Sequence, residues 1–372
     1  MKVGLLTLPL LYNYGAILQA YALYHKINEL GGECTLLDVD LPIYPYYRRP
    51  LSVVSRLFSK FIKHRDIEIF PYWMSKRTEK IISSKTRPFV EKMIPNRTHL
   101  IKKFSSDYDK FDVYIVGSDQ VWRRSLGLSV ENYLFDFVER DKRKCSYAAS
   151  FGVDYWEYSP KVTSKIRRLM SQFRCITVRE DSAVSLIQKK LGLEATHVLD
   201  PTLLLDRTEY INLIKNNEND KDNHFIFTYI LDLDRWKTNI VSQIEDTLEL
   251  PSIDILPRTK LGYFTSAENN IYPEVEKWLS DMAKCDAVVT DSFHGTVFSI
   301  IFNKPFCVLR NDCRGNTRLD SLLKMFHLQE RVAESAIDAR KVVRTNIDWD
   351  KVNYILETER EKSLNMLHLM IK

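Results

Sequence analysis

The sequence predicts an α/β protein with two Rossmann-like domains that face a cleft. Short apolar runs rich in Val, Ile and Leu alternate with amphipathic segments over most of the 372 residues, a pattern typical of parallel strands joined by helices. At least five of these runs end in a small polar loop. The segment 216–223, NNENDKDN, has no apolar residue and indicates a domain boundary. We therefore predict domains at 1–215 and 224–345, and a C-terminal helix at 346–372 that packs back on the first domain.

The first domain opens with a strand–helix–strand pattern. The apolar run 3–8 ends at Pro9, apolar residues follow at helical spacing from Ala16 to Tyr24, and this helix ends near Gly31 and Gly32. The loop between the first strand and the helix lacks the G-x-G-x-x-G fingerprint of dinucleotide sites. Further strands are expected, in order, at 34–39, 112–116, 144–152, 175–178 and 196–199.

The second domain centres on CDAVVTDSFHGTVFSIIFNKPFCVL at 285–309. The β-branched run 287–290 predicts a buried strand, and 296–302 forms the body of a helix that Asn303 and Pro305 end. Residues 306–309 are the next strand. The other elements expected here are strands at 224–231 and 253–256, a helix at 275–282 and a terminal helix around 352–371.

A Tyr-, Pro- and Lys/Arg-rich insertion at about 41–105 interrupts the first domain. Residues 51–100 hold eleven Lys and Arg against four Asp and Glu, a surplus of seven that exceeds the +5 of the whole chain. Apolar residues at 51–62 have helical spacing, which fits a helix packed on its own domain with a solvated basic face. The alternative is a helix that contacts an anionic membrane surface. No nucleic-acid-binding signature accompanies the charge, so no nucleic-acid partner is expected.

Composition excludes several other classes of protein. An apolar content of 45% with 28% charged residues is globular, and no apolar run approaches a membrane span of about 18 residues. The N-terminus leads directly into an amphipathic helix and is interpreted as a core strand, not a signal peptide. The six cysteines form no CxxC pair, which fits a reduced, cytoplasmic setting without structural zinc.

His294 follows a predicted strand and stands at the start of a helix, where open α/β sheets bind ligands. Asp291 and Ser292 are candidate caps of the same helix, and Ser292 and Gly295, in its first turn, are candidate binding residues. The alternative is structural, with His294 bonded to a backbone carbonyl and Ser292 serving as a cap. This stretch alone does not decide between the two.

Other strand-end loops carry similar residues. Candidate site residues in them are Asn13, Gly15, Ser118, Asp119, Gln120, Ser150 and Arg179, with Arg318 after Asn316-Thr317 in the second domain. The alternative for Arg179 is an ion pair with the adjacent Glu180 or Asp181. The pairs Asp38/Asp40 and Asp232/Asp234 have no nearby His or third carboxylate in sequence, so no metal site is expected.

Several of these stretches together resemble the polysaccharide pyruvyl transferase family. They are YNYGA at 12–16, VGSDQVW at 116–122, SYAASFG at 146–152, VRE at 178–180, DPTLLL at 200–205 and TDSFHGTVFSIIFNKPF at 290–306. They occur in the expected order over roughly 1–330, and the insertion and the C-terminal helix carry no match. The resemblance implies a GT-B-like fold. It also implies transfer of the enolpyruvyl group of phosphoenolpyruvate onto two hydroxyls of a sugar in a polysaccharide or lipid-linked glycan precursor, forming a pyruvate ketal and releasing phosphate.

The residues fit that chemistry. A donor with a phosphate and a carboxylate requires cations and helix N-termini, which favours Arg179 as an anion contact and Arg318 as a second. His294 would contact the donor or act as general acid, because the side chain of a histidine titrates near neutral pH. Asp119 and Asp291 are both strand-end carboxylates able to accept a hydroxyl proton, and either could instead be a helix cap. No cofactor is expected beyond phosphoenolpyruvate as donor substrate.

Two alternatives stay open on the sequence. A GT-B glycosyltransferase that uses a nucleotide sugar would share the fold, although no ribose-binding carboxylate or base-stacking slot is evident. A catalytically silent glycan-binding relative would keep the fold without turnover, and His294 and Arg179 argue against it. The acceptor sugar, its hydroxyl pair and the ketal stereochemistry are not encoded in any recognisable motif.

Overall fold

The computed structural model describes residues 1–40, 76–101, 104–105, 108, 110–126, 129–214, 224–257, 266–311 and 314–372. The helical pattern predicted at 51–62 and most of the basic insertion lie outside these residues. The domain boundary predicted at 216–223 also lies outside them and stays a prediction. In the described residues, no helix is long and apolar enough to cross a membrane.

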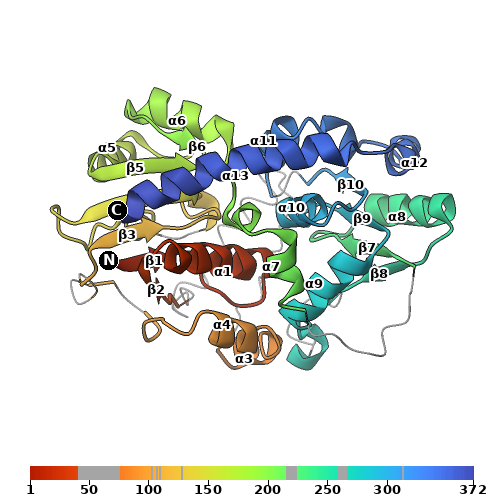
Figure 1. The fold of residues 1–372 in the computed structure, drawn as a ribbon, viewed down its shortest axis with the longest axis horizontal. Coiled ribbons are helices and arrows are strands. Elements are labelled where there is room, and N and C mark those ends of the chain that lie inside the picture. Colours follow the sequence, from red (N-terminus) through yellow and green to blue (C-terminus); the bar gives the residue numbers. More distant parts are fainter. Residues whose placement is uncertain are drawn as a thin grey trace, which may run out of the picture.

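Two all-parallel sheets form the protein, which confirms the predicted pair of Rossmann-like α/β units (Figure 1). The first sheet has six strands in the order β2-β1-β3-β4-β5-β6. Its strands are β1 (Lys2–Leu6), β2 (Glu33–Leu37), β3 (Val113–Val116), β4 (Arg143–Ala149), β5 (Phe173–Val178) and β6 (Thr196–His197). The second has five strands in the order β11-β10-β9-β7-β8. They are β7 (Ile226–Tyr229), β8 (Ser252–Asp254), β9 (Ala287–Thr290), β10 (Phe306–Leu309) and β11 (Val332–Ala333).

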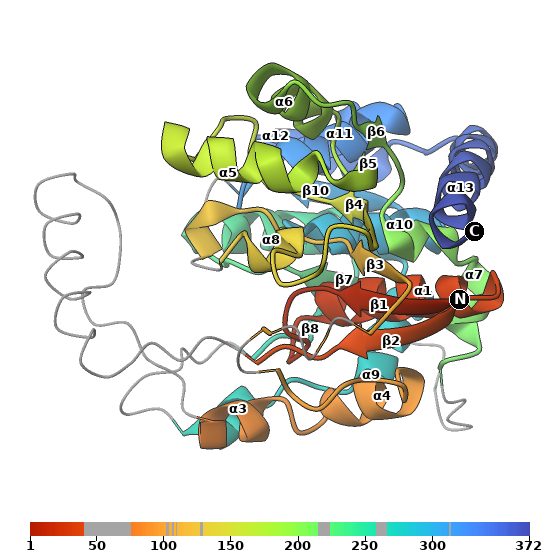
Figure 2. The ribbon, with the colours of Figure 1, turned by 90° about the vertical axis from the view of Figure 1, so that its left-hand side faces the viewer.

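Helices cover both faces of each sheet (Figure 2). The described α-helices that come before β7 in the chain are α1 (Tyr14–Glu29), α3 (Lys76–Ile82), α4 (Arg87–Met93), α5 (Pro160–Met170), α6 (Asp181–Leu191) and α7 (Arg207–Ile211). Those of the second half are α8 (Arg235–Leu248), α9 (Val275–Lys284), α10 (Phe293–Ile301), α11 (Thr317–Met325), α12 (Ala336–Arg344) and α13 (Trp349–Ile371). Short 3-10 turns complete the chain at η3 (Arg124–Leu126), η4 (Asn132–Leu134), η5 (Pro201–Leu204), η6 (Ala267–Asn270) and η7 (Gln329–Arg331).

One apolar core is shared by both sheets. Val3 and Leu5 of β1 lie in the same buried cluster as Val288 of β9, together with apolar residues of α1, α9, α10 and α13. The opposite face of each sheet has its own core, the first under α5 and α6 and the second under α8 and α12. Because the side chains of a strand alternate between the faces of a sheet, fully buried parallel strands supply both cores. The shared core fixes the two sheets relative to each other.

The C-terminal helix α13 contacts the chain that follows β6. The Arg360 guanidinium donates to the carbonyl oxygens of Leu203 at 2.8 Å and Leu205 at 3.3 Å. The amide of Leu199 donates to Ser363 Oγ at 3.0 Å. Figure 1 shows α13 running across the molecule from the second sheet to the first.

Candidate active site at the facing strand ends

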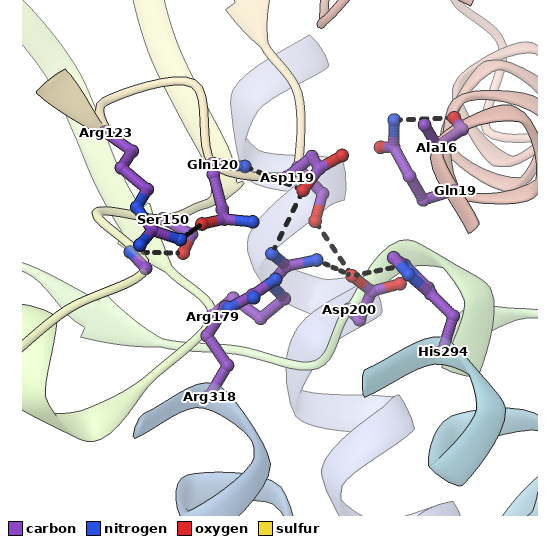
Figure 3. A network of polar contacts seen from close by, with 12 residues as sticks. Ala16, Gln19, Asp119, Gln120, Arg123, Ser150, Arg179, Asp200, His294 and Arg318 are labelled. Atoms are coloured by element: carbon purple, nitrogen blue, oxygen red, sulfur yellow. Dashed lines mark hydrogen bonds and ion pairs between the residues drawn. The ribbon is translucent and has the colours of Figure 1, made fainter. Parts of the chain in front are cut away.

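The carboxyl ends of the two sheets face each other, and the loops that follow them are in contact. Arg123, after β3, donates to the carbonyl oxygen of Arg314 at 2.8 Å, and the amide of Asp181, after β5, donates to Ser321 Oγ at 3.0 Å. Ligands of open α/β sheets bind at such carboxyl ends. The residues in Figure 3 therefore define a candidate active site.

Arg179 lies at the centre of this site. Its side chain is 1% exposed and donates to Asp200 Oδ2 at 2.8 Å, with Asp119 Oδ1 at 3.5 Å. Burial by itself would lower the pKa of Arg179, but Asp200, Asp119 and Glu180 outweigh it and raise the pKa. The sequence offered an ion pair with Glu180 or Asp181 as the alternative role of Arg179. These partners are wrong, because the paired carboxylates are Asp119, after β3, and Asp200, after β6.

Asp200 was not among the predicted site residues. Its carboxylate is fully buried and also accepts from Ser118 Oγ at 2.9 Å and from the amide and hydroxyl of Thr202. Burial opposes ionisation, but His294, Arg179 and Thr202 hold the pKa of Asp200 well below its usual range. Asp200 is therefore a permanent negative charge in the site, and the available signal was its place in Asp200-Pro201-Thr202 at a strand end.

His294 lies in the first turn of α10, which Ser292 caps by accepting from the Gly295 amide at 3.4 Å. The imidazole is buried, and its Nε2 lies 3.8 Å from Asp200 Oδ2, beyond hydrogen-bond length. Among the described residues this nitrogen has no hydrogen-bond partner. The sequence places His294 correctly at a strand-to-helix junction, and the structure aims it at Asp200.

Two glycines make this packing possible. A Cβ at Gly15, in the first turn of α1, would overlap the His294 ring, and a Cβ at Gly295 would overlap Thr290 Oγ1. The sequence marked Gly15 as a candidate site residue, and the group that lies against it is the His294 ring. Asn13 caps α1 by accepting from the Ala16 amide at 3.2 Å and is itself exposed.

Arg318 of α11 is a second buried guanidinium beside Arg179. The centroid of the Phe293 ring lies 4.5 Å from Arg179 Cζ and 5.8 Å from Arg318 Cζ. Arg318 donates to the carbonyl oxygen of Arg314 at 3.2 Å, and it forms no ion pair with any carboxylate in the described part of the chain. Burial and then the charge of Arg179 lower the pKa of Arg318 to about 10. Asp119 and Glu180 offset this lowering only in part, so Arg318 is a buried cation whose charge is incompletely neutralised.

Glu180 follows Arg179 directly and is hydrogen-bonded to Ser150 and the loop after β4. Glu180 Oε1 accepts from Ser150 Oγ and the Phe151 amide, each at 3.0 Å, and from the Gly152 amide at 3.3 Å. Its other oxygen is buried without a partner among the described residues. Burial raises the pKa of Glu180 despite the neighbouring arginines. Ser150 thus orients Glu180.

The loop after β3 carries the remaining predicted residues. Asp119 has a left-handed backbone (φ 79°), which is uncommon for a residue with a side chain, and its Oδ1 accepts from the Gln120 amide at 2.8 Å. Gln120 Oε1 accepts from Arg123 Nη1 at 2.5 Å. This strained turn brings the Asp119 carboxylate to Arg179, as Figure 3 shows.

Asp291 is held apart from this network. One oxygen accepts from the Leu231 amide at 2.6 Å, and the other accepts from Lys237 Nζ at 2.7 Å and Asn311 Nδ2 at 2.8 Å. With these strong donors in place, Asp291 fixes loops of the second sheet to each other. Of the two carboxylates that the sequence left equivalent, Asp119 is the one in contact with Arg179.

One group of carboxylates and histidine with metal-like spacing occurs in the described residues: His25, Glu29 and Glu209. It lies towards the C-terminal end of α1, and Lys26 Nζ already donates to Glu29 at 2.8 Å and to Glu209 at 3.2 Å. An ammonium group in this position replaces a metal ion in neutralising the carboxylates. Metal independence of the reaction remains a prediction.

The comparisons with known proteins agree with the fold. A Listeria monocytogenes protein whose name proposes a UDP-N-acetylglucosamine 2-epimerase matches with a TM-score of 0.51 and 12% identity, over 94% of this chain and 90% of that one. The S. aureus MnaA–UDP structure matches with a TM-score of 0.50 and 14% identity, over 96% of this chain and 90% of that one. At these identities the likeness shows the fold alone, a two-domain GT-B-like arrangement. No curated protein matches in sequence. The model of the family described as polysaccharide pyruvyl transferase matches residues 13–312. This range covers most of the chain and every candidate site residue except Arg318. The chain therefore belongs to the polysaccharide pyruvyl transferase family.

Proposed function

We propose that the protein transfers the enolpyruvyl group of phosphoenolpyruvate to two hydroxyls of one sugar, forming a pyruvate ketal and releasing phosphate. The sugar belongs to a polysaccharide or a lipid-linked glycan precursor. The chain's membership of the polysaccharide pyruvyl transferase family supports the class of reaction. The donor, the ketal product and the residue roles below are our proposal.

The observation that carries this proposal is the buried pair of guanidiniums around Phe293. Arg179 has Asp200 as a counter-ion at 2.8 Å, whereas Arg318 has no carboxylate paired with it among the described residues. Phosphoenolpyruvate carries two anionic groups, and an arginine binds either one with two parallel hydrogen bonds. We assign Arg318 to one of these groups and the buried Nε of Arg179, which has no partner among the described residues, to the other. Gly295 and Ser292, at the N-terminus of α10, complete the donor side.

The proposed reaction starts with a proton delivered to the methylene carbon of the donor, which leaves a cationic C2. His294 is the proposed general acid, because its Nε2 is buried and without a hydrogen-bond partner in the described residues. The first sugar hydroxyl attacks C2 and gives up its proton. The C2–O bond to phosphate then breaks with its electron pair on phosphate, and the second hydroxyl attacks C2, loses its proton and closes the ring.

Asp119 is the proposed base for a hydroxyl proton. Its Oδ1 is held by the Gln120 amide and faces Arg179, so its carboxylate is fixed in direction. Ser118 and Ser150 act indirectly by orienting Asp200 and Glu180, and Asn13 and Gly15, at the start of α1, line the site on the side of His294. We propose a cytoplasmic enzyme without a cofactor. Peripheral contact with an anionic membrane surface, suggested by the charge of residues 51–100, depends largely on residues outside those described.

The test measures phosphate release from phosphoenolpyruvate with a panel of sugar-diphosphate-lipid analogues, for wild type, His294→Ala and Arg179→Ala. Acceptor-dependent release that is lost in both variants supports the proposal. Lys362→Ala is a matched control, because Lys362 is an exposed cation on α13 that pairs with Glu359. A melting temperature that rises with UDP-sugars and not with phosphoenolpyruvate would contradict the proposed donor.

A further inference from the structure

Gln19 of α1 is a buried polar residue next to the site that the sequence analysis did not select. Its side chain is fully buried. The amide nitrogen Nε2 donates to Thr7 Oγ1 and to the carbonyl oxygen of Ala16, each at 2.9 Å. Both bonds require a donor, because the Ala16 carbonyl can only accept. The orientation of the amide group is thereby fixed, and neither of these two hydrogen bonds involves Oε1.

Oε1 of Gln19 has no hydrogen-bond partner among the described residues. A buried amide oxygen without a donor destabilises a protein, and natural structures contain few of them. Figure 3 shows this oxygen pointing away from the Ala16 carbonyl and towards the loop of Asp119. The contact network agrees, because Thr7 Oγ1, which accepts from Gln19, donates to the carbonyl oxygen of Ser118 at 3.3 Å. Gln19 is thus two hydrogen bonds from the residue that precedes Asp119.

The chemistry of this free atom limits its partner to a hydrogen-bond donor. An amide oxygen accepts hydrogen bonds and cannot donate them. Ionised phosphoenolpyruvate offers only acceptor oxygens, so it cannot satisfy Gln19. A sugar hydroxyl can. In Figure 3, Arg318, Arg179, Asp119 and Gln19 follow one another across the site. The two arginine cations lie at one end of this row, and the unsatisfied Gln19 acceptor lies at the other.

We propose that Gln19 Oε1 accepts a hydrogen bond from a hydroxyl of the acceptor sugar, and that Gln19 and Asp119 together position the two hydroxyls that form the ketal. One hydroxyl donates to the Asp119 carboxylate and the other to Gln19. This inference rests on the proposed function, and it divides the site into an anion-binding side and a hydroxyl-binding side. Gln19 moves no proton in this scheme; it orients the second nucleophile.

The test compares Gln19→Met, Gln19→Glu and Thr7→Val with wild type. Gln19→Met keeps the length of the side chain and removes both the bonded nitrogen and the free oxygen. Gln19→Glu removes the nitrogen and keeps an acceptor oxygen. Thr7→Val breaks the Gln19–Thr7 bond and leaves Oε1 in place. We expect Gln19→Met to lower kcat/KM for the acceptor by about 10-fold or more, with KM for phosphoenolpyruvate within about 2-fold of wild type.

The order of the variants separates a substrate contact from a structural role. If Gln19 only stabilises the fold, Gln19→Glu should be at least as impaired as Gln19→Met, because it adds a buried charge facing the Ala16 carbonyl. If Oε1 binds a hydroxyl, Gln19→Glu recovers part of the acceptor kcat/KM, and Thr7→Val stays within about 3-fold of wild type while melting at a lower temperature. Equal losses in Gln19→Met and Thr7→Val would overturn the inference.

A binding experiment separates this inference from the proposed reaction. The probes are methyl glycosides of glucose, galactose, mannose and N-acetylglucosamine, added at millimolar concentration during thermal melting of the four proteins. A rise in the wild-type melting temperature that Gln19→Met loses and Thr7→Val keeps supports the hydroxyl contact, even if phosphoenolpyruvate is not turned over. A rise that persists unchanged in Gln19→Met, or no rise with any probe in wild type, overturns it.

Discussion

Replacing Arg318 by methionine should stabilise the free protein and abolish its response to the donor. Burial and the charge of Arg179 lower the pKa of Arg318 to about 10. At 1.36 kcal/mol for each pKa unit, keeping this side chain charged in the folded protein costs about 3 kcal/mol relative to the unfolded chain. The cost is fully present below pH 10 and diminishes as the pH rises above that value, because the folded protein then releases the proton before the unfolded chain does.

Methionine removes this cost and preserves most of the apolar stem beside Phe293. It also loses the 3.2 Å hydrogen bond to the Arg314 carbonyl oxygen, which offsets roughly 1 kcal/mol of the gain. We therefore expect the free energy of unfolding at pH 7 to rise by about 1–2 kcal/mol, and the melting temperature by a few degrees. Wild type should melt at a higher temperature when phosphoenolpyruvate is added, since a ligand that binds only the folded state stabilises it.

The assay is thermal melting of wild type and Arg318→Met, each with and without phosphoenolpyruvate and inorganic phosphate. The reasoning predicts a higher starting temperature and no ligand-dependent rise for the variant. A variant that melts below wild type and still gains stability from phosphoenolpyruvate would refute both the uncompensated charge and its role in binding. Arg310→Met is the control, because Arg310 is an exposed arginine that already pairs with Asp320 at 2.9 Å.

Four further predictions concern the site and its proposed reaction. Asp200→Asn should lower kcat/KM by at least about 100-fold and destabilise the fold by about 3 kcal/mol, because Arg179 loses its buried counter-ion. A steady-state assay and chemical denaturation measure the two effects, and wild-type kinetics in the variant would contradict the prediction. The lowered pKa of Asp200 stabilises wild type above the ordinary aspartate pKa, and this contribution is lost as the pH falls below about 4, so the wild-type stability curve should fall more steeply in acid than that of Asp200→Asn. Gly15→Ala should reduce kcat by about 10-fold or more through displacement of the His294 ring, with the overall fold retained by circular dichroism; an unchanged kcat would show that the ring position does not matter. Activity should survive dialysis against EDTA, since no step of the proposed reaction uses a metal, and loss of activity that Mg²⁺ or Zn²⁺ restores would show otherwise.

Much of the architecture could be predicted because it depends on local patterns. Buried parallel strands are continuous apolar runs, and the helices between them show their spacing directly. The junction at His294 was visible for this reason, as was the placing of Arg179 after β5. Asp200 follows the strand expected at 196–199 but was not selected, because an aspartate before Pro201 fits a simple helix cap. Gln19 was overlooked because it lies inside a helix whose neighbouring residues are all buried apolar core.

The sequence by itself determined the two α/β units, the strand-end loops and the residue types that an anionic substrate requires, since these depend on hydrophobic periodicity and side-chain chemistry. Only the tertiary structure decided which of those residues act together. Asp119 and Asp291 occupy equivalent positions after a strand, yet Asp119 meets Arg179 whereas Asp291 is taken up by Lys237 and Asn311. Arg179 pairs with Asp200, and Arg318 has no carboxylate at ion-pair distance among the described residues. Pairing of this kind depends on the packing of two sheets against one shared core, which brings together residues that no local pattern connects.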